Sequence, residues 1–312
     1  MLRRRLYIGI IAVAVLVTFA VLSELRLKER GRVWNVEKKR GVISDYSKAR
    51  EYLEKYKKMF DKNSTTSVDP SQPSTVETWW QAAAIIDAYT RSDLRYACKA
   101  FQSFGNWAAC MDPPYIVKSP CLVYSFGIAW DYSFDDAMVA HGCEVHSFDP
   151  SMNLKDHQRS NNSYFYAIGL ASYNTNNFQP RRDIYVKKPQ VWKVRTLSAI
   201  KKMLGHEERT IDVLKLDIEG YEWTVLENLM ESGQLDNVRQ FSLEFHLFRD
   251  FPAKVDYVNF YKSYTALRED YGFLEYSVSP HGPVYREKDF NIQGDSQFVN
   301  SFFPYTSKRT TG

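Results

Sequence analysis

The sequence lacks the signals that mark zinc-stabilised or nucleic-acid-binding domains. It has four cysteines, and none of them forms a Cys-x-x-Cys pair or the Cys/His spacing of a structural zinc site. The net charge is +4, and because much of the positive excess lies before residue 60, the remaining chain has no basic stripe. We therefore expect no structural zinc site and no nucleic-acid partner.

Long apolar runs are also scarce, and the one that suits a membrane is residues 6–22, LYIGIIAVAVLVTFAVL, which carries no charge. Its length lies at the short end of the roughly 17–25 residues that span a bilayer. Three arginines precede it, so the positive-inside rule leaves that flank in the cytosol and the rest of the chain in the secretory lumen. We predict a single-pass type II membrane protein of the Golgi or endoplasmic reticulum. A chain secreted after signal-peptide cleavage is the alternative.

This interpretation divides the chain into a cytoplasmic tail (1–5), a signal anchor (6–22), a stem and linker (23–75) and a lumenal domain with an N-terminal helical extension (76–312). With 44% hydrophobic residues, the chain is long enough to bury one core. Two Asn-x-Ser/Thr sequons, at Asn63 and Asn161, agree with a lumenal location.

The cysteines lie close together in the sequence, at Cys98, Cys110, Cys121 and Cys143. An even number in an oxidising compartment favours two disulfides, and three pairings are open. We favour Cys98 with Cys110, because the loop between them contains a glycine turn. That leaves Cys121 and Cys143, which begin neighbouring predicted strands. Four free, buried thiols are the alternative.

Residues 121–150, CLVYSFGIAWDYSFDDAMVAHGCEVHSFDP, read as strand, glycine turn, helix and second strand, the first half of a nucleotide-binding α/β fold. Gly127 lies where the chain turns sharply beside a ligand. Ser133 is expected to cap the helix. Asp149 ends the second strand, about 20 residues after the turn, where such folds place a ribose-binding carboxylate. The alternative is an ordinary βαβ unit in which Asp149 caps the next turn.

Acidic residues gather at the end of a second apolar strand, in IDVLKLDIEGYE (211–222). Parallel strands bind ligands beyond their carboxyl ends, so Asp217 and Glu219 are expected in a site. Glu222 is explained by the dipole of the helix that follows. Glu244 and His246 alternate on the next apolar strand and so face the same side. A buried Glu–His pair that stabilises the sheet is the alternative for these two.

These segments carry a family resemblance. KLDIEGYEWTVLENL resembles the signature of the FkbM-type S-adenosylmethionine-dependent methyltransferases, and VYSFGIAWDYSFDDAM with CEVHSFDPS more narrowly resembles the methyltransferase-like protein 24 type. VWKVRTLSAI and SLEFH are similar to the segments on either side of the acidic strand. The resemblance covers roughly residues 98–303 and implies an α/β fold of class I, Rossmann-like methyltransferases: a mostly parallel sheet with a closing antiparallel strand.

The resemblance also implies a cofactor site for S-adenosylmethionine, built from Ser125, Phe126, Gly127, Asp131, Ser133, Asp149, Pro150 and Asp217. Related methyltransferases carry an acid where this chain has Ser125, and they have more glycines after the first one. Because a serine forms no salt bridge with the amino group of the cofactor, we expect Asp131 to supply that charge.

Methyl transfer from a sulfonium is an in-line displacement, in which the protein mainly positions the reactants. An oxygen acceptor additionally loses a proton to a base. The candidates for catalysis are Asp217, Glu219, Glu244 and His246, and a histidine titrates near neutral pH. A divalent metal held by Asp217, Glu219 and Glu244 is an alternative that we do not expect.

We therefore predict a membrane-anchored methyltransferase that methylates an oxygen of a glycan, a small molecule or a secreted protein. A type II membrane glycosyltransferase is one alternative, but the sequence has no Asp-x-Asp triplet, and Asp217-Ile218-Glu219 is the nearest substitute. A non-catalytic, membrane-tethered pseudo-methyltransferase is the other, and Ser125 is the feature that supports it.

The remaining pattern predicts helices and strands around these motifs. Helices are expected at 44–62, 76–90, 133–140, 196–204, 222–230 and 257–271. Strands are expected at 122–126, 143–148, 164–170, 211–216, 238–247, 273–278 and 297–303. The polar stretch at 172–188 is predicted as a loop or hairpin over the site, and the one at 279–295 as a loop and candidate lid.

Overall fold

A computed structural model describes residues 46–65, 67–92, 94–284 and 291–303. The predicted signal anchor, residues 6–22, lies outside these ranges. No helix within them is long and apolar enough to cross a membrane.

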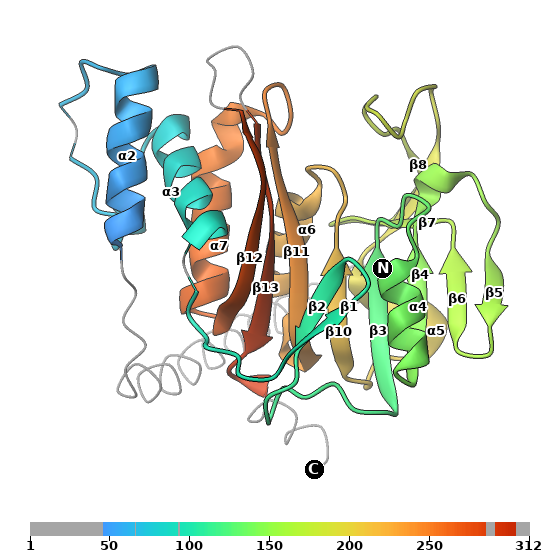
Figure 1. Ribbon diagram of the computed structural model, residues 1–312. Helices are drawn as coiled ribbons and strands as arrows, with labels where there is room; N and C mark the ends of the chain where they lie inside the picture. The colour runs from blue at the N-terminus through green and yellow to red at the C-terminus, as the bar shows by residue number, and fades with distance from the viewer. Residues whose placement is uncertain (1–45, 66, 93, 285–290, 304–312) are drawn as a thin grey trace, which may run out of the picture.

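An eight-stranded sheet forms the centre of the molecule, in the order β12-β13-β11-β10-β3-β4-β6-β5 (Figure 1). The strands are β3 (Cys121–Phe126), β4 (Cys143–Phe148), β5 (His157–Ser160), β6 (Ser163–Tyr166), β10 (Ile211–Leu216), β11 (Val238–Phe248), β12 (Phe273–Val284) and β13 (Asn291–Asn300). From β11 to β6 neighbouring strands are parallel, whereas β13 and β5 run against their neighbours. The structure therefore has the mixed α/β architecture with a mostly parallel sheet that the sequence predicts.

Both faces of this sheet are covered, which explains why β3 and β10 are mostly apolar and are buried along their whole length. On one face, Leu122 and Tyr124 belong to a core shared with α3 (Trp79–Ser92), α5 (Leu197–Leu204), α6 (Glu222–Glu231) and α7 (Tyr257–Glu269). On the other face, Val123 packs with α4 (Ser133–Ala140) and with Trp107. The two-residue period of a strand thus divides its side chains between two cores.

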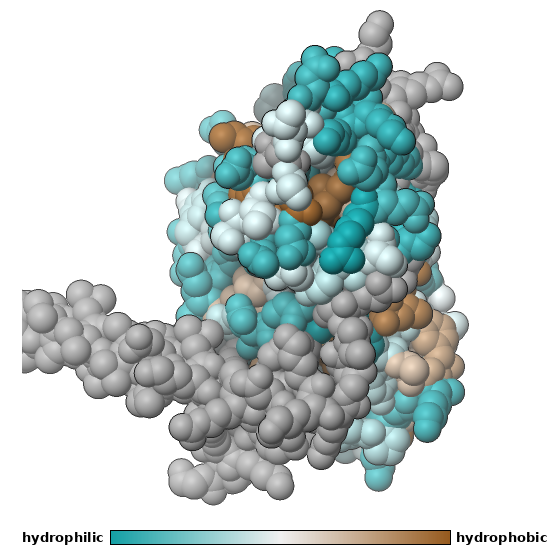
Figure 2. All heavy atoms as spheres, turned by 90° about the vertical axis from the view of Figure 1, so that its left-hand side faces the viewer, coloured by the Kyte–Doolittle hydropathy of each residue, from teal (hydrophilic) through white to brown (hydrophobic). Residues whose placement is uncertain are grey.

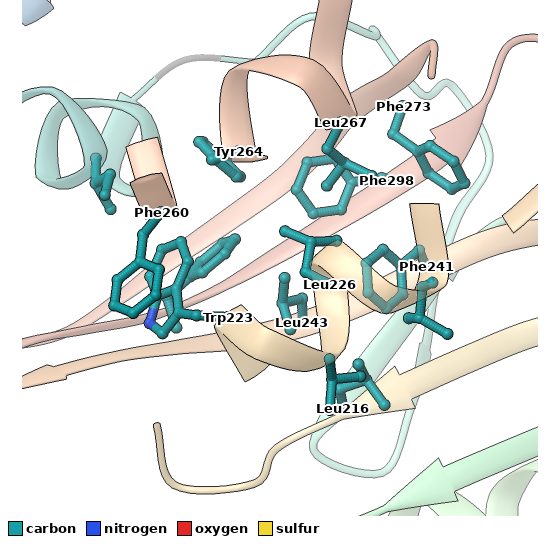
Figure 3. Packing of buried hydrophobic residues seen from close by; sticks show 14 of the residues in the cluster. Leu216, Trp223, Leu226, Phe241, Leu243, Phe260, Tyr264, Leu267, Phe273 and Phe298 are labelled. Atoms are coloured by element: carbon teal, nitrogen blue, oxygen red, sulfur yellow. The ribbon is translucent and has the colours of Figure 1, made fainter. Parts of the chain in front are cut away.

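Aromatic side chains fill the core between the helices and the carboxyl-terminal half of the sheet (Figure 3). The ring of Trp223 on α6 stacks on Phe260 of α7 at 5.0 Å between centroids. Phe245 of β11 meets Tyr264 of α7 edge-on at 4.8 Å. This packing fixes α6, which begins directly after the acidic loop at the end of β10.

The helix assigned to the stem, α2 (Ser47–Phe60), packs on α3 at one side of the molecule (Figure 1). It buries Ala49, Leu53 and Tyr56 in the main core, and the Tyr56 hydroxyl donates to Asp87 at 2.9 Å. Figure 2 shows this helical side, where hydrophilic residues form most of the visible described surface. Part of the predicted stem is therefore continuous with the domain.

Smaller elements complete the fold. They are the hairpin β1 (Phe101–Phe104) and β2 (Trp107–Cys110), the three-stranded sheet of β7 (Ile168–Leu170), β9 (Trp192–Arg195) and β8 (Thr175–Phe178), and the short 3-10 helices Pro73–Thr75, Pro150–Met152, Gln234–Asn237 and Lys254–Asp256. The sequence predicted a single strand over 164–170, which is wrong. The chain changes sheets at Ala167, because the carboxylate of Asp156 accepts its N–H and removes it from the ladder.

The prediction of a polar loop over residues 279–295 is also wrong. β12 continues to Val284 and β13 begins at Asn291, with Ser279 opposite Asp295. Along β13 partly exposed and buried residues alternate as far as Ser296. The polar residues therefore form one face of a strand pair, and their polarity reflects the cavity beside them.

Both disulfides have the pairing that the sequence analysis favours: Cys98 with Cys110 and Cys121 with Cys143. Cys121 and Cys143 are register partners at the start of β3 and β4. The second disulfide therefore joins the two strands whose far ends carry the glycine turn and Asp149.

Candidate functional site

A cavity of about 260 Å³ opens at the carboxyl ends of β3, β4 and β10, where parallel sheets bind ligands. Strand ends supply Phe126, Gly127, Asp149, Pro150, Asp217 and Glu219 to its wall. The segment predicted to lie over the site, residues 172–188, supplies Tyr173, Phe178 and Tyr185. The structure thus brings together most of the predicted cofactor residues around one cavity.

Glycine is required at the first turn. Gly127 has φ +78°, and a Cβ there would lie 1.6 Å from the carbonyl oxygen of Asp217. Its N–H donates to the carbonyl of Phe148, and the N–H of Asp217 donates to the carbonyl of Phe126. The ends of β3, β4 and β10 are therefore joined through this turn.

The residues after Gly127 hold an unfavourable backbone conformation that Asp149 stabilises. Ala129 and Trp130 have φ +46° and +73°, the left-handed region that non-glycine residues rarely adopt. One Asp149 oxygen accepts the N–H groups of Ile128 and Ala129, each at 2.9 Å. The other accepts from the N–H and hydroxyl of Ser151. Asp149 thus caps the next turn, as the alternative interpretation proposed, while also lining the cavity.

Ser125, Asp131 and Ser133 lie outside the cavity wall formed by the described residues. Ser125 is buried, and its hydroxyl donates to Asp135 of α4 at 3.3 Å. The Ser147 hydroxyl donates to the other Asp135 oxygen. Ser125 is therefore paired with a buried carboxylate of α4, and Asp135, like Ser125, is not among the described residues that line the cavity.

The predicted capping role of Ser133 is wrong. Ser133 is the first residue of α4, and no side chain of the preceding residue, Tyr132, caps the helix. Instead Asp131 accepts the N–H of Ser133 at 2.9 Å and a bond from the Asn106 amide at 3.3 Å. These bonds hold the Asp131 carboxylate at the start of α4, away from the cavity.

A second cavity, of about 710 Å³, adjoins the first and shares Asp183, Tyr185, Asp217 and Glu219 with it. Its remaining wall includes Arg181, Glu244, His246, Phe248, Phe251 and His281. Asp217 and Glu219 therefore stand at the junction of two spaces, one beside the glycine turn and one beside β11. Such a pair of spaces can hold a cofactor and an acceptor.

Glu222 fixes the acidic loop, a role that the sequence analysis missed. It is fully buried, and its two oxygens accept the N–H groups of Ile218 and Gly220, each at 2.8 Å. It also accepts from His246 Nδ1 at 2.9 Å. Glu219, between the two bonded residues, has φ +58°. The dipole of α6 favours an acid at position 222 but does not require one. The N–H groups of Ile218 and Gly220 do require an acceptor, and Glu222 provides it.

His246 does not suit the role of a base. Its Nδ1 lies 2.9 Å from Glu222 and its Nε2 lies 3.3 Å from Glu244. Burial alone would lower its pKa, but the two carboxylates together raise the pKa well above 6.5. His246 is therefore an imidazolium at neutral pH. The alternative of a buried pair of Glu244 and His246 is confirmed, and Glu222 adds a second carboxylate on the other ring nitrogen.

Asp217 has the properties of a base instead. Burial raises its pKa to about 7, against the opposing effect of Lys215, whose Nζ lies 3.7 Å away. The Lys215 ammonium is itself buried and donates to the carbonyl of Gly127. Burial also raises the pKa of Glu219. A carboxyl that titrates near pH 7 at the junction of two cavities can accept a proton during a reaction.

The three hypothetical metal ligands all line the second cavity, but their ligand atoms fall into two separate close groups. Asp217 and Glu219 group with His246, whereas Glu244 groups with His281 and Asp295. The sequon residues Asn63 and Asn161 are both exposed.

Comparison with known proteins identifies similar sequences. A family model described as a methyltransferase domain matches residues 39–282. Proteins called "Probable methyltransferase-like protein 24" from Homo sapiens and Rattus norvegicus are each 33% identical over 147 residues, which is 45% of this chain. The match spans 38% of the length of these curated relatives. No solved structure matches.

We predict that Glu222→Gln lowers the pKa of His246 and lowers the free energy of unfolding by about 3 kcal/mol or more, because it leaves a buried imidazolium with one charged partner. Histidine NMR titration and urea unfolding measure the two effects. Glu231→Gln, at the exposed end of the same helix, is the matched control. An unchanged His246 pKa in the folded variant would show that Glu222 does not set its charge.

Proposed function

Because the chain belongs to the family of methyltransferase domains, we propose that it transfers a methyl group from S-adenosylmethionine to an oxygen of its acceptor. The observation that carries this proposal is the position of Asp217. It lies where two cavities meet, and its pKa is raised to about 7. Methyl transfer to an oxygen needs a base at the point where cofactor and acceptor come together.

The residues of the smaller cavity fit the cofactor. Gly127 lines this cavity, and because it has no side chain, the turn lies directly against the backbone of Asp217. Phe178 and Trp192 stack at 6.0 Å between centroids and form an apolar wall suited to a planar base. Asp149 also lines this cavity, at the strand end where such folds place a carboxylate for ribose hydroxyls. The bound cofactor would supply an activated methyl group, which the acceptor attacks directly, so no side chain of the protein needs to act as a nucleophile.

The remaining steps belong to the protein. Asp217 takes the proton from the acceptor hydroxyl as the oxygen attacks. The Glu222–His246 pair holds the loop that carries Asp217, because Glu222 binds two of its N–H groups. Lys215 ties that loop to the glycine turn through the carbonyl of Gly127. Orientation of the two reactants is thus built into the ends of β3, β10 and β11.

A pseudo-methyltransferase is the second candidate, and one observation favours it. Both oxygens of Asp149 are already bonded within the protein, and Ala129 and Trp130 occupy positions where glycine would be less strained. In that case the bonds within the turn would take the place of bonds to a ligand. The binding experiment below separates the two candidates.

We also propose that the domain works in the secretory lumen, tethered by residues 6–22. Two disulfides, exposed sequon asparagines and the arginines before the apolar run support this location. The acceptor would then be a glycan, a small molecule or a secreted protein.

We expect the preference for S-adenosylmethionine over S-adenosylhomocysteine to increase as pH rises through about 7. Asp217, with its raised pKa, is neutral below that value and becomes a carboxylate above it, so that it attracts the sulfonium that only one ligand carries. Calorimetric titration of both ligands between about pH 6 and pH 8 should show a change of roughly three- to tenfold in the ratio of their dissociation constants.

Asp217→Asn should abolish this pH dependence. Asp250→Asn should retain it, because Asp250 lines the same second cavity with a side chain that is 90% exposed. Tight binding with a ratio independent of pH would contradict the role of Asp217. Absence of binding by folded protein would favour the pseudo-methyltransferase.

For the location, we expect the full chain expressed in animal cells to be membrane-bound and to lose mass on treatment with an N-glycosidase. Asn63→Gln and Asn161→Gln should each remove part of the shift, because each asparagine is exposed in its sequon. A full-length chain without glycans, whose domain is digested by protease added outside sealed vesicles, would contradict the lumenal location.

A further inference from the structure

A second cluster of titratable side chains lies away from both cavities. Glu144 and His146 alternate along β4 and therefore face the same side of the sheet. His206 follows α5, where Gly205 has φ +69° and ends the helix in a left-handed turn. Both histidines are buried, and Glu144 is partly buried. The proposed reaction uses none of these groups.

The three side chains converge on one point. His146 Nε2 lies 2.8 Å and His206 Nε2 lies 3.5 Å from the same oxygen of Glu144. Each residue offers one ligand atom, and all three atoms lie within 4.8 Å of one another. Ligands bound tetrahedrally to zinc at about 2.0–2.1 Å are about 3.3 Å apart. The two distances to Glu144 bracket that separation, so small movements suffice to admit an ion.

The hydrogen bonds fix which nitrogen of His206 carries the proton. Arg209 Nη1 lies 2.9 Å from His206 Nε2. Because a guanidinium only donates, this nitrogen carries no proton and accepts the bond with its lone pair. The proton is therefore on Nδ1, which donates to the buried Tyr124 hydroxyl at 2.8 Å. A metal-binding histidine needs this arrangement: one nitrogen facing the ion and the other held by an outer partner.

The charge state also suits a metal. Burial and Arg209 lower the pKa of His206 to about 4, and burial lowers the pKa of His146. Burial opposes ionisation of Glu144, but hydrogen bonds from His146 and Arg209 hold its pKa below the ordinary value. Two imidazoles and one carboxylate are a donor set that zinc binds in proteins.

The guanidinium of Arg209 lies where a metal ion would contact Glu144 and His206. Its Nη1 lies 2.9 Å from the second oxygen of Glu144 as well as 2.9 Å from His206 Nε2. The side chain is 41% exposed, so it can leave without opening the core. His146 is held independently, because its ring stacks on Tyr164 and Tyr166 of β6, at 5.0 and 5.8 Å between centroids.

We propose that Glu144, His146 and His206 form a zinc site that ties β4 to the turn after α5, and that Arg209 fills this site when zinc is absent. On binding, the proton of His146 moves from Nε2 to Nδ1. The Nδ1–H then donates a hydrogen bond to the Tyr166 hydroxyl, which lies 3.3 Å away. Arg209 releases His206 at the same time. Because the cluster contains no thiol, the spacing of the cysteines says nothing about zinc binding here.

The test uses the full chain with disulfides intact, stripped of metal by a chelator and titrated with Zn²⁺ against a chromophoric competitor. We expect one strongly bound zinc and a higher melting temperature with zinc. Glu144→Gln should weaken binding roughly 100-fold, and Tyr124→Phe roughly 10-fold. Arg209→Gln should tighten binding, because the competing cation is gone. His157→Gln, on the exposed strand β5, is the matched control and should change nothing.

Arg209→Gln keeps the proposal falsifiable if the buried variants do not fold, since Arg209 is half exposed. Tighter zinc binding in this variant supports the site, and unchanged or weaker binding overturns it, because a purely structural hydrogen-bond network gains no affinity from losing a member. Zinc that is retained in Glu144→Gln but lost in Asp295→Asn would place the ion at Glu244, His281 and Asp295 and would also overturn the proposal. No binding by folded wild-type protein would overturn it as well.

Discussion

The site depends on one buried ionic interaction, the contact of His246 with Glu222 and Glu244. Burying three ionisable groups is costly unless each is paired and hydrogen-bonded, and here the imidazolium bridges two carboxylates. Glu222 uses its remaining capacity to bind the N–H groups of Ile218 and Gly220. The interaction therefore holds the backbone of the acidic loop, and it leaves Asp217 as the carboxyl that titrates near neutral pH.

Buried polar groups also hold the glycine turn at the end of β3. Gly127 allows the end of β3 to contact the backbone of Asp217, and Lys215 donates to the carbonyl of Gly127. Asp149 holds the turn of Ala129 in its left-handed conformation. Strain in this turn is thus balanced by bonds to one carboxylate, and under the proposed function any ligand that binds Asp149 would also act on the shape of the turn.

The sequence predicted the architecture well, because apolar strands and their order along the chain depend on local pattern. It also favoured the correct disulfides, since Cys121 and Cys143 begin adjacent predicted strands. It failed where the outcome depends on residues from other elements. His246 appeared to be a base because a histidine alone titrates near neutrality, and its partner Glu222 lies on a different element. The first part of β13, residues 291–295, was taken for a loop because its polar residues lie beside a cavity that the sequence does not show.

The most direct test of the account is transfer of labelled methyl from S-adenosylmethionine to a lumenal extract of secretory membranes, with wild-type protein and with Asp217→Asn. The account predicts label that resists mild base, as an ether does, and a rate that falls roughly 10²–10⁴-fold in the variant while S-adenosylmethionine still binds. Transfer that is equally fast without the Asp217 carboxylate would contradict it.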